Sequence, residues 1–369
     1  MTKPVAVKCV SPALDYSGYA ESSRNMIMAL HKAGVEITTT NVHYQNLPME
    51  LGEAGEFAAG REGVSLDYNK VIIETTPENF HKYLEPMKYH VGRFYWETDK
   101  LNETFVWGCN HVEEVWISTP SHVEIFKRNG VKVPIVPIQD CMEVNFKPFK
   151  PYQIREHRGF LFYSIFQWTP RKNPESLLKT YWKTFSGKDN VSLLLKVYRV
   201  DFSDAEKNAI KNEIKTWKDE LKLEHYPKVL LYLGPMNRNE VMRLHATGDC
   251  FVSAHRGEGW GYPQMEAMVS GKPIISTNYE GIHEWVDDTV GWLLPHKMVP
   301  VEGMNWIPWY DKTQNWAEVD KMALAKAMKE AYSNPRITHQ KGRNAKKMVE
   351  QKFSLEVVGR IMKNRLEEI

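Results

Sequence analysis

The sequence predicts an α/β protein with two domains, each organised around a parallel sheet. The chain has 369 residues, a length that suits two domains of ordinary size. Val5–Val10 and Val35–Thr40 are strand-like and flank a helical segment. The stretch Cys250–Ser276 has the order strand, glycine-rich loop, helix and strand. Because strand–helix–strand units build parallel sheets, one such sheet is expected in each half of the chain.

The composition is typical of a globular protein without a membrane span. Charged residues make up 25% and apolar residues 42% of the chain, and no apolar run approaches the roughly 20 residues that cross a bilayer. Met1–Val10 lacks a signal-peptide pattern. The net charge of +2 is too small to indicate nucleic-acid or membrane binding by itself. The 4 cysteines form no CxxC pair, so we expect no zinc or redox motif and a reduced cytoplasmic location.

The first half continues with alternating strands and helices. Tyr19–Ala33 is predicted to be a helix because Met26, Ile27 and Leu30 fall on one side, and Gly34 ends it. Further strands are expected at residues 71–74, 90–96, 114–119 and 133–138.

The connections of the first half carry weaker signals. Thr119 is expected to cap the helix that begins at Pro120. The glycine- and glutamate-rich stretch 47–67 is interpreted as a surface loop. The alternative is a mobile insertion on the rim that faces an acceptor. Pro148 and Pro151 mark the linker to the second half.

The second half begins at Gly159 and repeats the alternation. Strands are expected at 159–166, 191–198, 228–233, 250–254, 274–277 and 292–295, and helices at 174–185, 202–223, 238–247 and 264–270. Asn173 and Asn237 are the expected N-caps of two of these helices. The chain is expected to end with a long loop at 296–314 and helices at 315–333, 338–352 and 354–368.

The long loop 296–314 is rich in aromatic residues. Trp306, Trp309 and Tyr310 are expected to hold the loop on its own domain. The alternative is that they cover an acceptor or another chain.

The glycine-rich loop after the strand 250–254 has the features of a ligand site. Ligands of parallel α/β sheets bind beyond the carboxyl ends of the strands. Backbone N–H groups of a glycine loop and a following helix N-terminus favour an anion. Glu258 in the loop and Glu266 in the helix can each accept hydrogen bonds from hydroxyls. A phosphate flanked by hydroxyl-binding acids describes a sugar nucleotide, although a glycine loop before a helix is also common without any such ligand. The other loop residues expected to bind the donor are Gly259, Trp260, Gly261 and Tyr262.

Basic residues follow two other strands of the second half. Arg171 and Lys172 precede the helix at 174–185 and could bind a diphosphate. The Arg171 guanidinium could donate two parallel hydrogen bonds, and the Lys172 ammonium could act as a point charge. A solvated basic pair is the alternative. Lys196 lies near the end of the apolar run 191–198, so we expect it to contact a phosphate or sugar, or to extend toward solvent.

The string EGWGYPQMEAMVSGKPII resembles the E-x7-E signature of retaining glycosyltransferases of family 4, the group 1 glycosyl transferases. The flanking strings LYLGPMNRNEVMRLHATGDCFVSA and STNYEGIHEWV are similar to the same family. In the first half, SGYAESSRNMIMALHKAG resembles the family's first loop and helix. The segment that begins YWETDKLNETFVWG resembles a subgroup of it.

The resemblance implies the GT-B fold, in which two Rossmann-like domains face each other across a cleft. We expect an acceptor-side domain at 1–150, a nucleotide-sugar domain at 151–352 and a last helix at 353–369 that packs back on the first domain. The implied activity is metal-independent and needs no cofactor besides a nucleotide-diphosphate sugar as co-substrate. The sequence contains no Asp-x-Asp motif.

The resemblance also assigns roles to the acids and bases of the second half. Lys172 falls on the position of the family's pyrophosphate-binding lysine. The family's upstream arginine position holds Gln167, so Arg171 is expected to substitute. Glu266 is expected to hold the ribose hydroxyls, and Glu258 to hold sugar hydroxyls and favour positive charge at the sugar ring.

Four further residues take their expected roles from the resemblance, and His81 is named as a fifth, more distant candidate. Gly18 would let the backbone meet the donor phosphates, although many members have two glycines there. Met236 and Val241 are the expected base-site residues. Glu97 is expected in the cleft, where members of the wider family often place a histidine, and His81 is a more distant candidate.

The sequence therefore predicts a retaining glycosyltransferase that uses a UDP- or GDP-sugar. The expected acceptor is a glycan or a lipid-linked sugar, with a hydroxymethylated base in DNA as an alternative. Two other classes stay open, namely another GT-B chemistry such as a sugar-nucleotide epimerase or glycan phosphorylase, and a non-catalytic sugar-nucleotide-binding protein.

Overall fold

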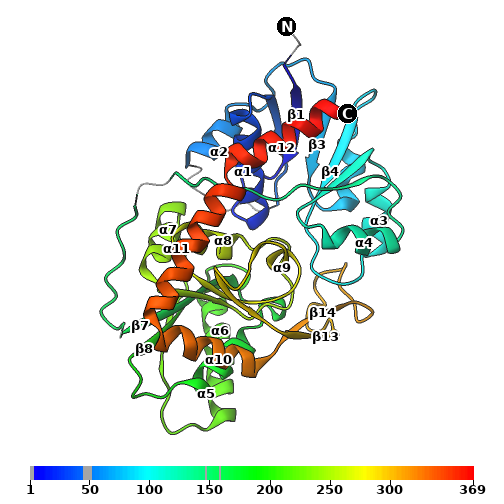
Figure 1. The fold of residues 1–369 in the computed structure, drawn as a ribbon. Helices are drawn as coiled ribbons and strands as arrows, with labels where there is room; N and C mark the ends of the chain where they lie inside the picture. Colours follow the sequence, from blue (N-terminus) through cyan, green and yellow to red (C-terminus); the bar gives the residue numbers. More distant parts are fainter. Residues whose placement is uncertain (1–3, 45–51, 146–147, 158) are drawn as a thin grey trace. The chain divides into compact units, whose positions relative to one another are not determined.

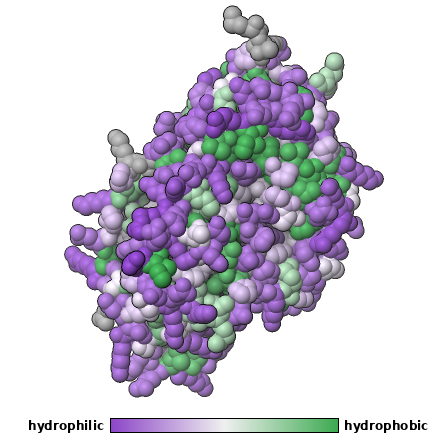
Figure 2. Space-filling view, viewed as in Figure 1, coloured by the Kyte–Doolittle hydropathy of each residue, from purple (hydrophilic) through white to green (hydrophobic). Residues whose placement is uncertain are grey.

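The computed structural model describes residues 4–44, 52–145, 148–157 and 159–369. The chain forms two compact units (Figure 1). The first contains residues 1–146 and 350–369, and the second contains residues 147–349. Among the described helices, none is long and apolar enough to cross a bilayer. Figure 2 shows that hydrophilic residues cover most of the face in view, with smaller hydrophobic patches between them.

The first unit is organised around a parallel sheet of 6 strands in the order β2-β1-β3-β4-β5-β6. Cys9 of β1 lies opposite Thr39 on one side and Ile72 on the other. The strand order reverses between β1 and β3, because β2 lies on the opposite side of β1. The strands are β1 (Ala6–Ser11), β2 (Glu36–Asn41), β3 (Lys70–Glu74), β4 (Tyr89–Arg93), β5 (Glu114–Ile117) and β6 (Ile135–Pro137).

The helix α1 carries the main apolar face of the first unit. Ser17 caps α1 by accepting a hydrogen bond from the Ala20 N–H at 3.1 Å. The residues Met26, Ile27 and Leu30 are fully buried, as the helical pattern predicts. The helices of this unit are α1 (Gly18–Lys32), α2 (Gly52–Ala59), the 3₁₀ helix η1 (Pro77–Tyr83), α3 (Glu103–Cys109), α4 (Ser121–Arg128) and α12 (Leu355–Glu368).

The last helix, α12, lies along α1 (Figure 1). Leu355, Val358, Met362 and Leu366 belong to the same buried cluster as the apolar residues of α1. A side chain at Gly359 would place its Cβ 2.1 Å from the Ala29 carbonyl oxygen, so glycine is needed where the two helices approach. Ser354 caps α12 through the Val357 N–H.

The second unit has its own parallel sheet of 6 strands in the order β12-β11-β10-β7-β8-β9. Phe251 of β10 lies opposite Tyr163 of β7. The chain order reverses at this pair, which makes β7 and β10 the topological switch point of the sheet. The strands are β7 (Phe160–Gln167), β8 (Val191–Tyr198), β9 (Lys228–Tyr232), β10 (Cys250–Ser253), β11 (Ile274–Thr277) and β12 (Gly291–Leu294).

The helices of the second unit begin where the cap residues predict. The side chain of Asn173 accepts from the Ser176 N–H, and Asn237 forms a capping box with Glu240. Both predicted caps are therefore confirmed. The helices are the 3₁₀ turn η2 (Pro170–Lys172), α5 (Pro174–Thr184), α6 (Asp204–Leu221), α7 (Arg238–Thr247), α8 (Tyr262–Val269), α9 (Gly281–Trp285), α10 (Lys321–Ser333) and α11 (Pro335–Lys352), whose end enters the first unit.

Two predictions for the first half are wrong. The stretch 47–67 contains the helix α2, although residues 47–51 lie outside the described residues. Thr119 does not cap α4 with its side chain, because its hydroxyl is hydrogen-bonded to the Nδ1 of His122 at 2.8 Å. Pro120 occupies the N-cap position instead, with helical dihedral angles.

The segment 296–319 also differs from the prediction of a long loop followed by a helix. It forms an antiparallel hairpin of β13 (His296–Pro300) and β14 (Asn315–Val319), and α10 starts only after the cap at Asp320. Tyr310 packs beside Trp316 in a small buried cluster of this hairpin. Trp306, in contrast, is 59% exposed, so only part of the aromatic group holds the loop in place.

Candidate active site

The predicted glycine loop lies at the switch point of the second sheet. It follows β10 and leads into α8, while the basic turn η2 follows the neighbouring strand β7. The two segments touch through the backbone, where the Arg256 N–H donates to the Arg171 carbonyl at 2.7 Å. The carboxyl ends of β7 and β10 therefore bring the acidic and the basic candidates together, at the place where parallel α/β sheets bind ligands.

Glu258 is paired with Lys172. The Lys172 ammonium donates to a Glu258 carboxylate oxygen, and each side chain is only 11% exposed. Arg171 lies alongside and donates from Nη1 to the Gly257 carbonyl at 2.9 Å. Burial opposes ionisation of Glu258, but the Lys172 and Arg171 cations outweigh it and lower the pKa of this carboxyl to about 2. Glu258 is therefore a fixed negative charge at neutral pH.

Glu266 forms a second buried acidic centre. One carboxylate oxygen accepts from Arg238, and the other lies 3.1 Å from Nε2 of His245. His245 is fully buried, burial lowers its pKa, and its Nδ1 lies 3.0 Å from the Tyr163 hydroxyl. A neutral imidazole with its proton on Nε2 satisfies both contacts. Burial opposes ionisation of Glu266 as well, but the Arg238 charge and the His245 hydrogen bond lower its pKa to about 2.

The glycine loop itself is tightly packed. Gly259, Trp260 and Tyr262 are buried, and Trp260 faces Trp285 of α9 with ring centroids 5.5 Å apart. Gly261 has a φ of 95°, a conformation that favours glycine, and caps α8. A Cβ at Gly261 would lie 2.6 Å from the Cδ1 of Ile282. The loop and α9 thus fit each other closely, which fixes the backbone between the two acids.

Lys196 is buried near the carboxyl end of β8. It is 3% exposed, and its ammonium lies 5.2 Å from the ring centroid of Tyr198 and 5.4 Å from that of Phe202. Burial lowers the pKa of Lys196 to about 8. Because a buried cation held by ring faces is poorly solvated, this amine is well suited to meet an anion.

The expected base-site residues sit around the start of α7. Met236 is buried in the turn between β9 and α7, whereas Val241 is half-buried within α7. Arg238, the first residue of α7, reaches Glu266 from the same turn. Met236 and Val241 therefore lie within three residues of Arg238, which contacts Glu266, the residue expected to bind the ribose.

Two predicted site residues, Gly18 and Glu97, belong to the first unit, and so does the more distant candidate His81. Gly18 is exposed at the start of α1, and a Cβ there would meet no atom within 4 Å, so packing does not require glycine. Glu97 is half-buried four residues beyond the end of β4, which is shorter than predicted. His81 lies in η1 on the surface, with its ring 5.2 Å from that of Trp107.

The first unit holds a buried polar network that the sequence analysis did not identify. The Ser22 hydroxyl of α1 lies 2.7 Å from a Glu74 carboxylate oxygen and 2.9 Å from an Asp140 carboxylate oxygen, and donates to one of them. Arg93 donates to Asp140 at 2.5 Å, and the Tyr95 hydroxyl donates to Asp140 at 2.8 Å. Glu74 is fully buried and ends β3, and burial raises its pKa. The network ties together the carboxyl ends of several strands next to the α1 N-terminus.

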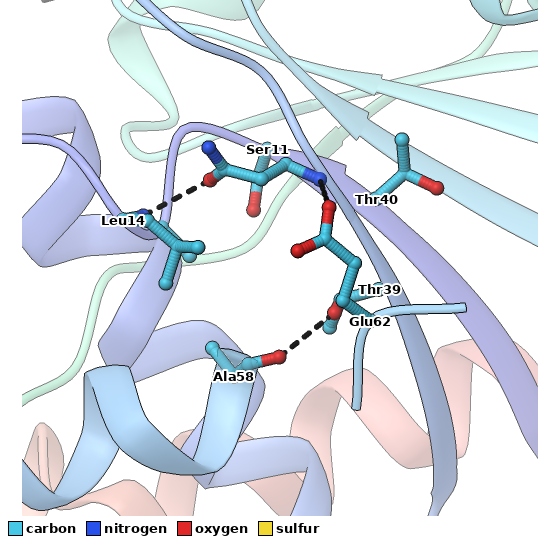
Figure 3. Close-up of a pocket in the computed structure, with 8 residues that line it drawn as sticks. Ser11, Leu14, Thr39, Thr40, Ala58 and Glu62 are labelled. Carbon is cyan, nitrogen blue, oxygen red and sulfur yellow. Dashed lines mark hydrogen bonds between the residues drawn. The ribbon is translucent and has the colours of Figure 1, made fainter. Parts of the chain in front are cut away.

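A pocket lies at the ends of β1 and β2 (Figure 3). In it the Leu14 N–H donates to the Asn41 side chain at 3.0 Å, and the Asn41 N–H donates to Glu62 at 3.3 Å. Thr39 donates to the Ala58 carbonyl at 2.9 Å. None of the predicted site residues lines this pocket. The remaining lining residues are Ser11, Ala13 and Thr40.

The chemistry of the second-unit site is that of anion and hydroxyl recognition. Two ionised carboxylates accept hydrogen bonds, and the cations of Lys172, Arg171 and Arg238 surround them. Across the described ranges, no group of three or more His, Cys, Asp or Glu side chains is arranged to hold a metal ion.

Three residues of the site were missed by the sequence analysis. Arg238 and His245 hold Glu266, but both lie on α7, more than 20 positions away in the chain. Glu280 accepts a hydrogen bond from the Glu258 N–H at 3.1 Å. The string RNEVMRLHAT, which forms α7, contains both partners of Glu266. Arg238 and His245 are seven positions apart, which places them on one helix face and could have marked them.

Comparison with known proteins finds a family match in the half of the chain that contains this site. Residues 153–302 match the family model described as Glycosyl transferases group 1. That range contains η2, the glycine loop and both acids of the site. No curated protein sequence matches the chain.

Solved structures resemble the whole chain at low sequence identity. A sucrose-phosphate synthase from Thermosynechococcus elongatus has a TM-score of 0.69 at 14% identity, over 99% of this chain and 98% of that one. The Anabaena protein HepE, solved with UDP-glucose, has a TM-score of 0.64 at 14% identity over 99% and 100%. A glycosyltransferase from Rickettsia africae has a TM-score of 0.63 at 14% identity over 99% and 98%. The predicted GT-B fold is thus confirmed, and residues 153–302 of this chain are similar to the Glycosyl transferases group 1 family model.

Proposed function

We propose that this protein is a retaining glycosyltransferase that moves a sugar from a nucleotide-diphosphate sugar to a hydroxyl acceptor without a metal ion. One observation carries the proposal. Glu258 and Glu266, with seven residues between them, are both buried and ionised at the switch point, with Lys172 and Arg171 beside them. A ligand with hydroxyls at both ends and a diphosphate between them matches this distribution of charge.

The reaction breaks the bond between the anomeric carbon and the diphosphate through an oxocarbenium-like transition state. Lys172 and Arg171 would stabilise the charge that develops on the leaving diphosphate, helped by the N-terminus of α8. Glu258 would bind sugar hydroxyls and favour positive charge at the ring. Because Lys172 holds Glu258 in an ion pair, we assign Glu258 no covalent bond to the sugar. The leaving phosphate would take the acceptor's proton.

The nucleotide would be held by the α7–α8 region. Glu266 would bind the ribose hydroxyls, and Met236 and Val241 would line the base site. Lys196 would contact a phosphate or the sugar. UDP-sugars are the first donors to test, because the similarly folded HepE was solved with UDP-glucose, and GDP-sugars are the second.

The first unit would bind the acceptor, with Gly18 at the donor phosphates and Glu97 near the acceptor. A glycan or lipid-linked sugar is the proposed acceptor class. We place the protein in the reducing cytoplasm, which agrees with four buried cysteines that form no disulfide.

The decisive experiment is a thermal-shift panel of UDP-, GDP-, ADP- and TDP-sugars, followed by turnover with the donor that binds. The expected result is stabilisation by one nucleotide class and acceptor-dependent nucleotide release, with the anomeric configuration kept in the product. Glu220→Gln, which alters an exposed ion pair far from the site in sequence, is the control. Sugar alteration without an acceptor would indicate an epimerase, dependence on phosphate a phosphorylase, and binding without turnover a non-catalytic role.

A further inference from the structure

The segment after β11 contains a strained residue that contacts the glycine loop. Glu280 has a φ of 55° and a ψ of −135°, a combination that non-glycine residues rarely adopt. Such strain persists only where the surroundings enforce it. Its side chain is a carboxylate, yet the residue is only 5% exposed. A strained backbone and a buried carboxylate at one position indicate that Glu280 has a specific contact to make.

The carboxylate of Glu280 holds the backbone of the loop acid. One of its oxygens accepts from the Glu258 N–H at 3.1 Å. The side chain of Glu258 meanwhile points to Lys172. Glu258 is thus fixed twice, by Glu280 through its backbone and by Lys172 through its side chain.

The backbone next to Glu280 touches the loop directly. A Cβ at Gly281 would lie 2.6 Å from the Gly259 carbonyl oxygen and 2.8 Å from the Trp260 Cα. Only glycine therefore allows this approach at position 281. The close contact explains why residue 280 must turn sharply, and the turn aims its carboxylate at Glu258.

We propose that Glu280 is a positioning residue that sets the geometry of the glycine loop, and through it the placement of the Glu258 carboxylate against the donor sugar. This inference rests on the proposed function. A hydrogen bond to a charged acceptor is among the stronger ones in proteins, and a shift of about 1 Å in a catalytic group can cost on the order of 100-fold in rate. The effect is expected on the chemical step rather than on nucleotide binding, because Glu266 and its partners lie on α7 and α8.

The test compares three variants. Glu280→Gly removes the carboxylate and the strain, while Glu280→Gln keeps an oxygen that can accept the same hydrogen bond. Lys222→Gly is the matched control, since Lys222 also has a left-handed backbone (φ of 50°) but is exposed at the end of α6. We expect Glu280→Gly to lower kcat about 10- to 100-fold with an unchanged Kd for the free nucleotide, Glu280→Gln to keep kcat within a few-fold, and Lys222→Gly to keep both.

Two outcomes would overturn the inference. One is a kcat of Glu280→Gly within twofold of the wild type. The other is an equal loss of kcat and nucleotide affinity in Glu280→Gly and Glu280→Gln, which would indicate general disruption of the site.

A measurement without turnover separates this inference from the proposed function. Hydrogen exchange of the peptide covering residues 256–262 should be faster in Glu280→Gly than in the wild type, and unchanged in Lys222→Gly. If the wild type turns over no donor, the proposed function fails, and unchanged exchange in Glu280→Gly would then refute the positioning role by itself.

Discussion

Lys172 and Glu258 form an ion pair in which both side chains are almost completely shielded from solvent. The lysine that is predicted to bind the donor's diphosphate therefore already serves as the counter-charge of the acid that is predicted to bind the sugar. The two roles are coupled, because a change in either residue leaves the other as an uncompensated charge in a buried site.

The coupling predicts the behaviour of Lys172 variants. Lys172→Ala should lower turnover strongly and also destabilise the protein by about 3–5 kcal/mol, the usual cost of removing one partner of a buried pair. The double variant Lys172→Met/Glu258→Gln should recover most of the stability but no activity. Urea unfolding and a turnover assay measure the two effects separately. A double variant as unstable as Lys172→Ala would refute the coupling.

Glu266 variants should affect nucleotide binding. Glu266→Ala removes the acceptor of both Arg238 and His245, and we expect it to weaken the Kd for nucleotide and donor at least about tenfold. The ion pair of Glu220 with Lys179, far from Glu266 in sequence, offers a control, since Glu220→Ala should leave the Kd unchanged. Isothermal titration calorimetry of both variants measures the Kd for nucleotide. Wild-type affinity in Glu266→Ala would contradict the assignment of the ribose site.

The two acids also predict how stability depends on pH. In the folded protein the pKa of Glu258 and that of Glu266 are lowered to about 2, from an ordinary 4.5. The unfolded chain therefore binds protons that the folded one does not between those values. The stabilisation is complete above about pH 4.5 and is lost as the pH falls toward 2. Urea unfolding at several pH values should show this loss, and it should be smaller in Glu258→Gln/Glu266→Gln.

The lowered pKa of Lys196 predicts that nucleotide affinity changes at alkaline pH. Its pKa is lowered to about 8, so the ammonium loses its proton as the pH rises through that value. If Lys196 contacts a phosphate, nucleotide affinity should be constant below about pH 7 and weaken above pH 8. Lys196→Met should bind more weakly and lack this Lys-dependent step. The difference between the two titration profiles isolates the lysine, and parallel profiles would exclude it from the site.

The local structure was largely predictable because its signals are local. Asn173 and Asn237 cap their helices through contacts three residues along the chain, so composition and spacing suffice to find them. The helix α2 was missed because its glycines and glutamates show a weak apolar pattern. The strand β14 was missed because it runs almost directly into α10, with only Asp320 between them.

Only the site residues that follow a strand in the chain could be predicted from the sequence. Glu258, Glu266 and Lys172 follow strands whose ends meet at one edge of the sheet, and topology alone brings them together. Their partners depend on packing between elements. The contact of Glu266 with Arg238 follows from how α7 lies against α8. The backbone of Glu280 could not be predicted, because glutamate gives no signal for a positive φ.

The helix α12 completes the buried cluster of the first unit with Leu355, Val358, Met362 and Leu366. During synthesis, the ribosome makes the rest of that unit some 200 residues before it supplies these side chains. The apolar residues of α1 therefore lack their α12 partners until translation of the second unit is finished.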